Sequence, residues 1–358
     1  MTKLSSFYKT LLLGIMIPFG VKSQIPTPEQ YVCLTSKSEI KIDGILAEEE
    51  WGDAEWTSDF VDIEGNKKPK PTYRTRAKML WDDKYFYVAA EIEEPHLWAT
   101  YDQRDAIIYH ENDFEVFIDP DGDTHQYYEL EINALGTVWD LLLIKPYRDG
   151  APAIDAWDIT GLKKGIKLNG TLNNPSDRDK GWTVELAMPW NILNEAAPNG
   201  KKPEAGDTWR VNFSRVNWQT EGTDNGYQKK INPATNQSYP EFNWVWSPQG
   251  VIAMHQPETW GYVTFANNST KEATEPLGIK EQYVLREVYH LQQAYFKNNQ
   301  AYTSQVDLSE IKKDWKGDIK IYCTPSMFEA TIANGFTTWH INHEGRVWKT
   351  VSNSNNQL

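Results

Sequence analysis

Carboxylates alternate with aromatic and aliphatic residues along residues 112–133, and the residue types of this stretch could do chemistry. Apolar and polar residues alternate with a period of two on both sides of Gly122, which is typical of two half-buried strands joined by a turn. One face of the first strand is then apolar, and the other carries Glu115, Phe117 and Asp119. A carboxylate among aromatic rings on the open face of a sheet can hold a sugar, because rings stack on its CH groups and the carboxylate accepts from its hydroxyls. The alternative is a solvated sheet face that binds nothing.

Glu131 lies on the strand that follows Glu115, so the two carboxyl groups could also form a catalytic pair. Paired carboxylates act as acid and base, or as acid and nucleophile, in glycoside hydrolysis. The catalytic hypothesis requires Glu115 and Glu131 to share one face of the sheet. The sequence leaves open whether this face binds a glycan or cleaves one.

An aromatic loop before this stretch supplies further candidates for sugar contact. Trp98 and Tyr109 flank Arg104, and flat rings near a guanidinium suit both stacking and hydroxyl binding. The alternative is a loop that packs its own aromatic residues together.

Later in the chain, one strand and one loop carry the remaining candidates. Arg215 follows Ser214 in an alternating segment, and a structural pair with an acidic residue competes with a ligand role for it. Met254 and His255 occupy a loop before the last strand, and loops held by a rigid sandwich commonly carry binding residues. A lone histidine, however, is more often a hydrogen-bonding loop residue than a catalyst.

Asp119, Asp121 and Asp123 recur at every second residue around Gly122. Hard carboxylate oxygens at this spacing can bind calcium, but the glutamate that closes an EF-hand loop is missing. The alternative is a plain acidic turn; any calcium here would be structural, and no other cofactor is expected. The sequence has no Cys/His cluster of zinc spacing, no glycine-rich phosphate loop and no G-x-S-x-G elbow.

The elements that must position these residues are many short strands. Alternating segments separated by Gly, Pro, Asn and Asp predict an all-β protein, a β-sandwich of the immunoglobulin-like or jelly-roll type, over residues 24–266. Residues 267–278 are polar and predict a linker. Apolar residues at helical spacing then predict one long helix from Ile279, followed by a small antiparallel sheet. Residues 279–358 are therefore expected to form a small C-terminal α+β extension.

The N-terminus predicts export. Residues 1–23 combine a basic start, an apolar segment and small residues before Gln24, as in a cleaved signal peptide. No cysteine stands at the cleavage point, and no later segment has the roughly 20 apolar residues of a membrane span. A secreted protein, periplasmic or extracellular, without lipid anchor or membrane insertion, is expected.

The charge balance restricts the partners. The formal net charge is −14, and loss of Lys3, Lys9 and Lys22 with the leader makes it −17. An acidic surface argues against nucleic acid and leaves neutral glycans open. Cys33 and Cys323 could form a disulfide in an oxidising compartment, but two cysteines are not a disulfide framework. Composition leaves this pairing and the oligomeric state undecided.

Five motifs occur in order along residues 42–265. They are the "DG…EW" opening at 42–51, a "DdeyLYv"-like strand at 81–88, an "EiFiD" strand at 115–119, a "y.vE.aipw"-like strand at 182–190 and a closing segment at 243–263. In these motifs the chain resembles the family 9 carbohydrate-binding module and its longer relatives in secreted bacterial proteins. The "EiFiD" strand is the most specific of the five.

The resemblance implies a β-sandwich that holds the end of a glycan between two aromatic rings, with a carboxylate and amides on the sugar hydroxyls. The family's binding glutamate falls on Glu115, and its first tryptophan on Tyr109. Its arginine falls near Glu131, its amide near Ser214 and its second tryptophan near Met254. Because these positions differ, the glucose or xylose specificity of the well-understood members is not carried over, whereas the fold is.

The predicted function is glycan or oligosaccharide recognition in polysaccharide catabolism, by a secreted protein that is non-catalytic. The alternative is a hydrolase of glycosidic bonds that uses Glu115 and Glu131 on the same sandwich. A third hypothesis is an assembly protein whose C-terminal tail docks a partner.

Overall fold

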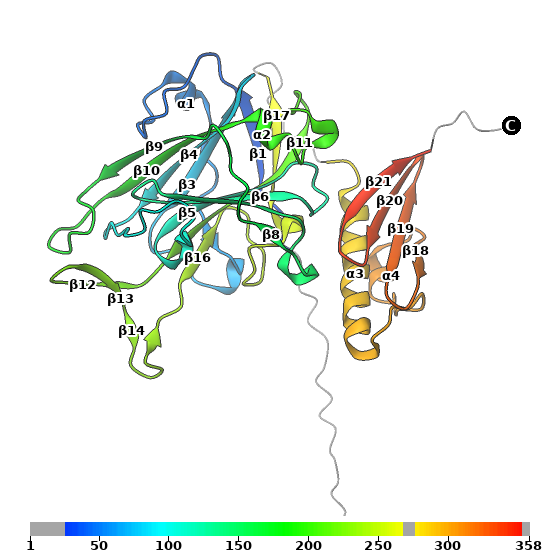
Figure 1. The fold of residues 1–358 in the computed structure, drawn as a ribbon. Coiled ribbons are helices and arrows are strands. Elements are labelled where there is room, and N and C mark those ends of the chain that lie inside the picture. Colours follow the sequence, from blue (N-terminus) through cyan, green and yellow to red (C-terminus); the bar gives the residue numbers. More distant parts are fainter. Residues whose placement is uncertain (1–25, 268–275, 353–358) are drawn as a thin grey trace, which may run out of the picture.

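The computed structural model describes residues 26–267 and 276–352. The predicted leader and most of the predicted linker lie outside these residues. A large β-rich part holds residues 26–267, and a smaller part with one long helix and a sheet holds residues 276–352 (Figure 1). No helix among the described residues is both long and apolar enough to cross a membrane.

The first sheet of the large part has the strand order β8-β7-β6-β5-β11-β17, and its neighbours are antiparallel. β5 lies in the middle of this sheet, between β6 and β11, where both of its edges are hydrogen-bonded. The strands are β5 (Asp113–Asp119), β6 (Tyr127–Asn133), β7 (Val138–Leu143), β8 (Ala153–Ile154), β11 (Thr208–Asn217) and β17 (Gly261–Ala266).

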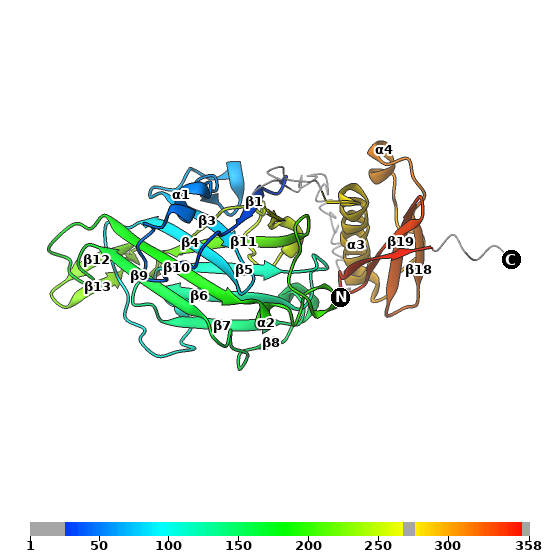
Figure 2. The same cartoon turned by 90° about the horizontal axis from the view of Figure 1, so that it is seen from above.

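The second sheet has the order β3-β4-β10-β9, again antiparallel. Its strands are β3 (Thr75–Trp81), β4 (Tyr85–Glu93), β9 (Lys163–Asn169) and β10 (Gly181–Pro189). The N-terminal strand β1 (Gln30–Thr35) joins the two sheets, because it runs parallel to β17 along most of its length and parallel to β3 at its end. The sandwich is therefore closed by hydrogen bonds along this one edge (Figure 2).

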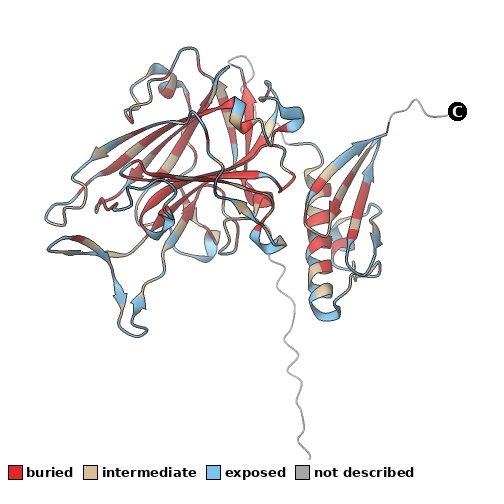
Figure 3. Cartoon of the chain, in the orientation of Figure 1, coloured by how far each residue is buried: buried red, intermediate tan, exposed pale blue. Residues whose placement is uncertain are grey.

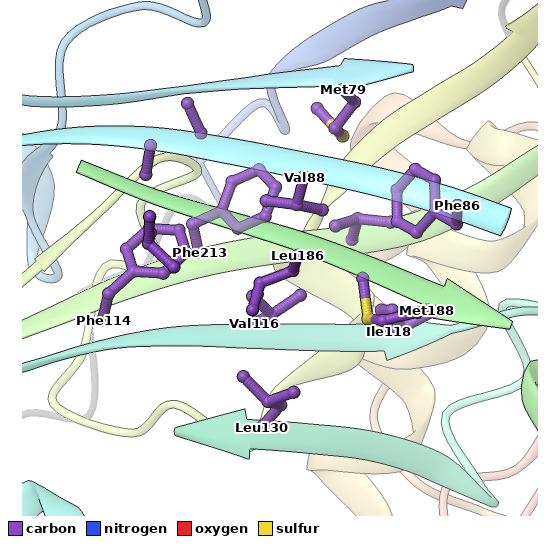
Figure 4. Close-up of a cluster of buried hydrophobic side chains, with 14 of the residues drawn as sticks. Met79, Phe86, Val88, Phe114, Val116, Ile118, Leu130, Leu186, Met188 and Phe213 are labelled. Carbon is purple, nitrogen blue, oxygen red and sulfur yellow. The ribbon is translucent and has the colours of Figure 1, made fainter. Parts of the chain in front are cut away.

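The two sheets pack face to face around one apolar core (Figure 4). Phe86 and Val88 of β4 lie on one side, and Phe114 and Val116 of β5 on the other. Phe114 also stacks on Phe213 of β11, with ring centroids 5.7 Å apart.

Burial is strongest along the central strands (Figure 3). The alternation predicted half-buried strands with an open face, but β5 and β6 are buried on both faces, which corrects that expectation for Glu115, Phe117 and Asp119. The predicted β-sandwich is confirmed.

The remaining elements of the large part are short, and two small hairpins extend beyond the sandwich (Figure 1). The hairpins are β12 (Thr220–Thr223) with β13 (Gly226–Lys229), and β14 (Ile231–Asn232) with β15 (Gln237–Ser238). The others are β2 (Val61–Asp62), β16 (Phe242–Val245), the helices α1 (Glu49–Asp53) and α2 (Trp190–Leu193), and the 3₁₀ turns η1 (Gly65–Lys67), η2 (Ile108–His110), η3 (Tyr147–Asp149), η4 (Pro198–Gly200) and η5 (Pro257–Thr259).

A buried carboxylate explains the spacing of the opening "DG…EW" motif. Glu185 of β10 accepts hydrogen bonds from the indole Nε1 of Trp51 at 2.8 Å and from the backbone nitrogens of Asp43 and Gly44 at 2.9 and 2.6 Å. Gly44 has φ +83°, and a Cβ there would come within 2.5 Å of the Ile166 backbone. The motif thus fixes the entry of the chain onto the second sheet.

The tail is a four-stranded antiparallel sheet covered by one helix, which confirms the predicted α+β extension. Helix α3 (Ile279–Asn299) contributes Leu285, Val288 and Tyr289 to a small core that includes Ile332 and Ile341 of the sheet. The strands are β18 (Lys320–Cys323), β19 (Phe328–Asn334), β20 (Thr337–Asn342) and β21 (Val347–Val351), with α4 (Ile311–Asp314) before them.

Buried charges join the tail to the sandwich. The Arg148 guanidinium binds Glu258 in a bidentate pair, with N···O distances of 2.8 and 3.0 Å. Arg286 of α3 approaches the same carboxylate at 3.8 Å and is almost fully buried. Burial alone would raise the pKa of Glu258, but the two arginines outweigh it and lower the pKa to about 2.

Cys33 and Cys323 are both free thiols. Cys33 is buried in β1 of the sandwich, whereas Cys323 is exposed on β18 of the tail. The disulfide that the sequence left open is therefore not formed in the structure.

Candidate functional site

Three carboxylates meet on the face of β5 and β6 that points away from the sandwich core. Glu115 of β5 lies opposite Glu131 of β6 in the antiparallel register, and Asp113 lies one pleat further along β5 on the same face. One carboxylate oxygen of each lies within 4.8 Å of one of each of the others. All three are buried, with 1–4% of their surface exposed. We call Asp113, Glu115 and Glu131 the carboxylate cluster.

The cluster is poorly neutralised by the protein. Asp113 accepts a hydrogen bond from the Val216 backbone and Glu131 one from the Tyr109 backbone. The outer oxygens of Asp113 (Oδ2) and Glu115 (Oε2) have no hydrogen-bond partner among the described residues. Burial raises the pKa of Glu115 to about 7. Burial and then neighbouring carboxylates raise the pKa of Asp113 and of Glu131 well above the usual range.

Aromatic rings border the cluster. Tyr109, in the 3₁₀ turn η2, is 40% exposed, and its backbone N–H donates to Glu131 Oε2 at 2.9 Å, which fixes the residue beside the cluster. Its ring lies 6.1 Å from that of Trp139, the residue opposite Glu131 on β7. The indole of Trp218 donates to the Tyr109 carbonyl and carries the ammonium of Lys229 3.2 Å from its ring centroid.

His255 belongs to the apolar end of the same sheet face. Its Nδ1 lies 3.0 Å from the Tyr127 hydroxyl, and its Nε2 lies 4.0 Å from Glu129 on β6. Burial lowers the pKa of His255 to about 4, so the ring is neutral at ordinary pH. The neighbouring Met254 packs against a small apolar cluster that includes Trp260.

Of the other candidates from the sequence, one lies on the same sheet face as Glu115 and three lie elsewhere. Ser214 lies directly opposite Glu115 on β11, fully buried, and its hydroxyl acts on the Glu115 carboxylate and offsets part of the rise that burial causes in the pKa of Glu115. Arg215, the next residue, points to the other face, where it binds Glu94 at 2.6 Å. Trp98 is buried, and Arg104 pairs with Asp140 and Asp158.

The predicted calcium turn brings Asp119, Asp121 and Asp123 together, with oxygens within 4.8 Å of one another. Asp119 accepts from the backbone of Gly122 and Thr124, as expected for a tight acidic turn. Asp123 also accepts from the Arg346 guanidinium of the tail at 2.7 Å. The turn therefore acts in the contact between sandwich and tail.

Two surface pockets lie away from the carboxylate cluster. One, of about 980 Å³, runs between the sandwich and the tail and is bordered by Asp121, Trp209 and Trp348. The other, of about 440 Å³, lies at the ends of β4 and β10 and is bordered by Arg74 and Arg178. Neither is lined by the carboxylate cluster or by Tyr109.

Residues 42–268 match the protein family described as carbohydrate family 9 binding domain-like. The match covers well over half of the chain, and it includes the carboxylate cluster and Tyr109. The chain belongs to this family. The resemblance seen in the five sequence motifs is thereby confirmed.

The chain is similar to parts of two longer curated relatives. The chain is 25% identical over 175 residues to Exoglucanase XynX of Acetivibrio thermocellus, which is 43% of this chain and 14% of that protein. It is 25% identical over 174 residues to Endo-1,4-beta-xylanase A of Thermoanaerobacterium saccharolyticum, 43% of this chain and 13% of that protein. The chain therefore spans about a seventh of the length of these relatives.

Two solved structures are among those similar to this chain. A family 9 module from Caldicellulosiruptor kristjanssonii in complex with cellotriose has a TM-score of 0.43 and 16% identity, over 70% of this chain and 99% of that one. A putative carbohydrate-binding protein from Bacteroides uniformis has a TM-score of 0.48 and 14% identity, over 67% of this chain and all of that one.

Sequence reasoning did not identify Asp113, Trp139, Trp218 and Lys229 as neighbours of Glu115. Trp139 reaches the cluster through the β6–β7 register, which sequence does not specify. Trp218 comes directly after β11, the strand that carries Ser214, and this position in the sequence could have indicated that its ring lies near the cluster.

Proposed function

We propose that this protein binds carbohydrate on the sheet face formed by Glu115, Tyr109 and Trp139. The observation that carries the proposal is the position of Tyr109, whose partly exposed ring is held beside the buried carboxylates by its own backbone hydrogen bond to Glu131. Family membership supports the same face, because the matched residues 42–268 include Glu115 and Tyr109, where the resemblance in the motifs places a binding glutamate and an aromatic ring.

The geometry suits a sugar whose CH groups stack on the Tyr109 ring and whose hydroxyls donate hydrogen bonds to the carboxylates. The Tyr109 ring offers a flat surface for CH groups, and the acceptor oxygens of the cluster lie on the strands beside its backbone. Acceptors that are buried and unpartnered form stronger hydrogen bonds with sugar hydroxyls than solvated ones do. The finer role that we propose is recognition of a polysaccharide by an exported protein during its breakdown.

The test is binding to a glycan panel that includes glucose, cello-oligosaccharides and xylo-oligosaccharides. Tyr109→Ala should weaken binding to the recognised glycan about tenfold, the equivalent of roughly 1.4 kcal/mol, while the fold is kept because the ring is partly exposed. Tyr322→Ala, which removes an exposed ring from the tail sheet, is the matched control and should bind as the wild type does. Equal weakening in both variants, or binding to no glycan, contradicts the proposal.

The export step has its own test. Secreted protein should begin at Gln24, and mass spectrometry of the N-terminus checks this. A protein that keeps residues 1–23 or carries a lipid would contradict the proposed location.

A hydrolytic function is the second candidate, because Glu115 and Glu131 do share one face. Their nearest oxygens lie within 4.8 Å, whereas retaining glycosidases keep roughly 5–5.5 Å and inverting ones roughly 6.5–9.5 Å between the two carboxyl groups. A pair whose nearest oxygens lie within 4.8 Å is compatible with the retaining separation, so product analysis decides between binding and cleavage. New reducing ends from wild type but not from Glu115→Gln, in the same panel, would establish hydrolysis.

A further inference from the structure

The pocket between the sandwich and the tail has the size and the position of a ligand site. Its volume is about 980 Å³, and pockets that bind small ligands measure roughly 300–1,000 Å³ and occur preferentially where two domains meet. Asp121 and Lys201 line it from the sandwich, and Gln282 of α3 and Trp348 of β21 line it from the tail. Both α3 and β21 lie on the side of the tail nearest the sandwich (Figure 1). We call this space, bordered by these four residues, the junction pocket.

Direct contacts hold the two walls of the junction pocket together. The Val347 backbone N–H of β21 donates to the Asp123 carbonyl at 3.0 Å. The Thr124 hydroxyl donates to the Gly345 carbonyl, also at 3.0 Å, and the Arg346 guanidinium binds the Asp123 carboxylate at 2.7 Å. These contacts join β21 to the turn after β5, so the pocket is formed before a ligand enters it. A preformed site loses less conformational entropy on binding than one that must first be ordered.

Trp348 offers the junction pocket an aromatic ring in a fixed orientation. The half-buried indole stacks on the His340 ring, with centroids 5.0 Å apart and planes inclined by 8°. His340 is itself held from both nitrogens, because Nδ1 lies 2.7 Å from Glu329 and Nε2 lies 2.8 Å from Thr350. The indole N–H of Trp348 makes no hydrogen bond to any of the described residues. A ring held in this way can stack on the CH groups of a sugar, and its N–H can donate to a hydroxyl.

The charges that line the junction pocket are balanced. Four acidic and four basic side chains border it, although the chain as a whole has a net charge of −14. Lys202 is already paired with Asp83. Lys201, Asn199 and Gln282, in contrast, have no side-chain hydrogen bond within the part of the chain that the structure describes. A neutral ligand with many hydroxyl groups suits this lining, because it needs no counter-charge and can accept and donate hydrogen bonds.

We propose that the junction pocket is a second glycan-binding site, in which a neutral oligosaccharide stacks on Trp348. The class of ligand rests on the proposed function, whereas the pocket is separate from the face that carries Tyr109. Glu115 and Asp119 are four residues apart on β5, which corresponds to roughly 13 Å at about 3.3 Å per residue, and the pocket begins beyond Asp119. Two sites at this separation give a polysaccharide that reaches both a higher affinity than a short oligosaccharide has for either.

Isothermal titration calorimetry of the full chain with cellobiose and with xylobiose counts the sites, because neither disaccharide is long enough to occupy both. Wild type should bind two equivalents of the recognised disaccharide, and Trp348→Ala and Tyr109→Ala should each bind one. Trp348→Phe keeps a flat ring and should bind two. Tyr322→Ala removes an exposed ring from the same tail sheet, outside the pocket, and as the matched control should also bind two.

A second variant keeps the test valid if Trp348→Ala does not fold, which circular dichroism would reveal. Lys201 is exposed on the sandwich wall of the junction pocket, outside the core of the tail. Lys201→Trp should fill the pocket from that side and remove one equivalent, while the fold is kept.

The outcomes separate the second site from the first. One equivalent in wild type that Tyr109→Ala removes, and that Trp348→Ala and Lys201→Trp leave in place, overturns the second site and keeps the proposed function. One equivalent that Trp348→Ala and Lys201→Trp remove, and that Tyr109→Ala leaves in place, keeps the second site and contradicts the site beside Tyr109. Equal losses in Trp348→Ala and Tyr322→Ala overturn the stacking role of Trp348. Tighter binding of digalacturonate than of either neutral disaccharide, lost in Lys201→Trp, overturns the neutral class of ligand.

Discussion

Removing the charge of Glu258 tests how much its buried ion pairs, with Arg148 inside the sandwich and with Arg286 of the tail, stabilise the protein. In Glu258→Gln the side chain keeps its size, but Arg148 loses a bidentate partner and Arg286 loses the carboxylate 3.8 Å away. No nitrogen of the Arg286 guanidinium has a hydrogen bond among the described residues, so the substitution leaves this buried cation with Asp149 as its remaining acidic neighbour. We expect the full chain to be clearly less stable.

Two estimates of the size of this effect agree. The pKa of Glu258 falls from 4.5 to about 2, and at about 1.36 kcal/mol per unit this corresponds to roughly 3 kcal/mol of stabilisation. Removing one partner of a buried ion pair costs about 3–5 kcal/mol. Because the folded pKa lies below the unfolded one, the stabilisation is fully present above the unfolded pKa and is lost as the pH falls through about 2.

Urea denaturation at neutral pH, followed by circular dichroism, measures the effect. The control is Glu344→Gln, which removes a carboxylate from a more exposed pair with Lys145 at the same boundary and should cost about 1 kcal/mol or less. The wild type should also lose its greater stability relative to Glu258→Gln as the pH is lowered from about 4.5 toward 2. The reasoning would be refuted if Glu258→Gln lost no more free energy of unfolding than Glu344→Gln. It would also be refuted if the difference in stability between wild type and Glu258→Gln did not change over this pH range.

Three further outcomes can be measured simply. Phe213→Ala should lower the free energy of unfolding by about 3–5 kcal/mol in urea denaturation, because the ring is fully buried between the sheets; a loss below about 1 kcal/mol contradicts the described core. Glu185→Gln should cost about 1–3 kcal/mol, since an amide cannot accept from Trp51 and the two backbone donors equally well, and wild-type stability would exclude the anchoring role. Iodoacetamide should label Cys323 in the folded protein and Cys33 only after denaturation, checked by mass spectrometry; equal labelling of both would argue against a buried Cys33.

The fold was predictable because alternation and turn residues are local signals. The strand expected at residues 114–118 is observed as β5 (Asp113–Asp119), and the helix expected from Ile279 begins there. Both Ser214 and Arg215 were candidates for sugar contact, but neighbours on one strand point to opposite faces, so only Ser214 shares the face of Glu115. The face of each side chain is fixed once a segment is a strand, so a single sequence could have shown this.

The neighbours of Glu115 were less predictable, since they depend on register and on loops. Trp139 faces Glu131 only because β7 pairs with β6 in one register out of several possible ones. Trp98 and Tyr109 are close in sequence, yet one is buried away from the cluster and the other borders it. Arg104 binds aspartates that lie 36 and 54 positions further along the chain, and no local pattern contains such a contact.

The position of β1 has a consequence for how the chain comes to be folded. Residues 30–34 pair with residues 262–266, so the seam of the sandwich joins segments more than 200 positions apart. During synthesis the seam strand emerges early, and only its end, Leu34 and Thr35, can pair with β3 before β17 has followed. Closure of so large a loop carries an entropic cost before any contact repays it, and such distant pairing slows folding. Shortening the protein from either end of the sandwich should therefore open the same seam, and the newly exposed strand edge would favour self-association.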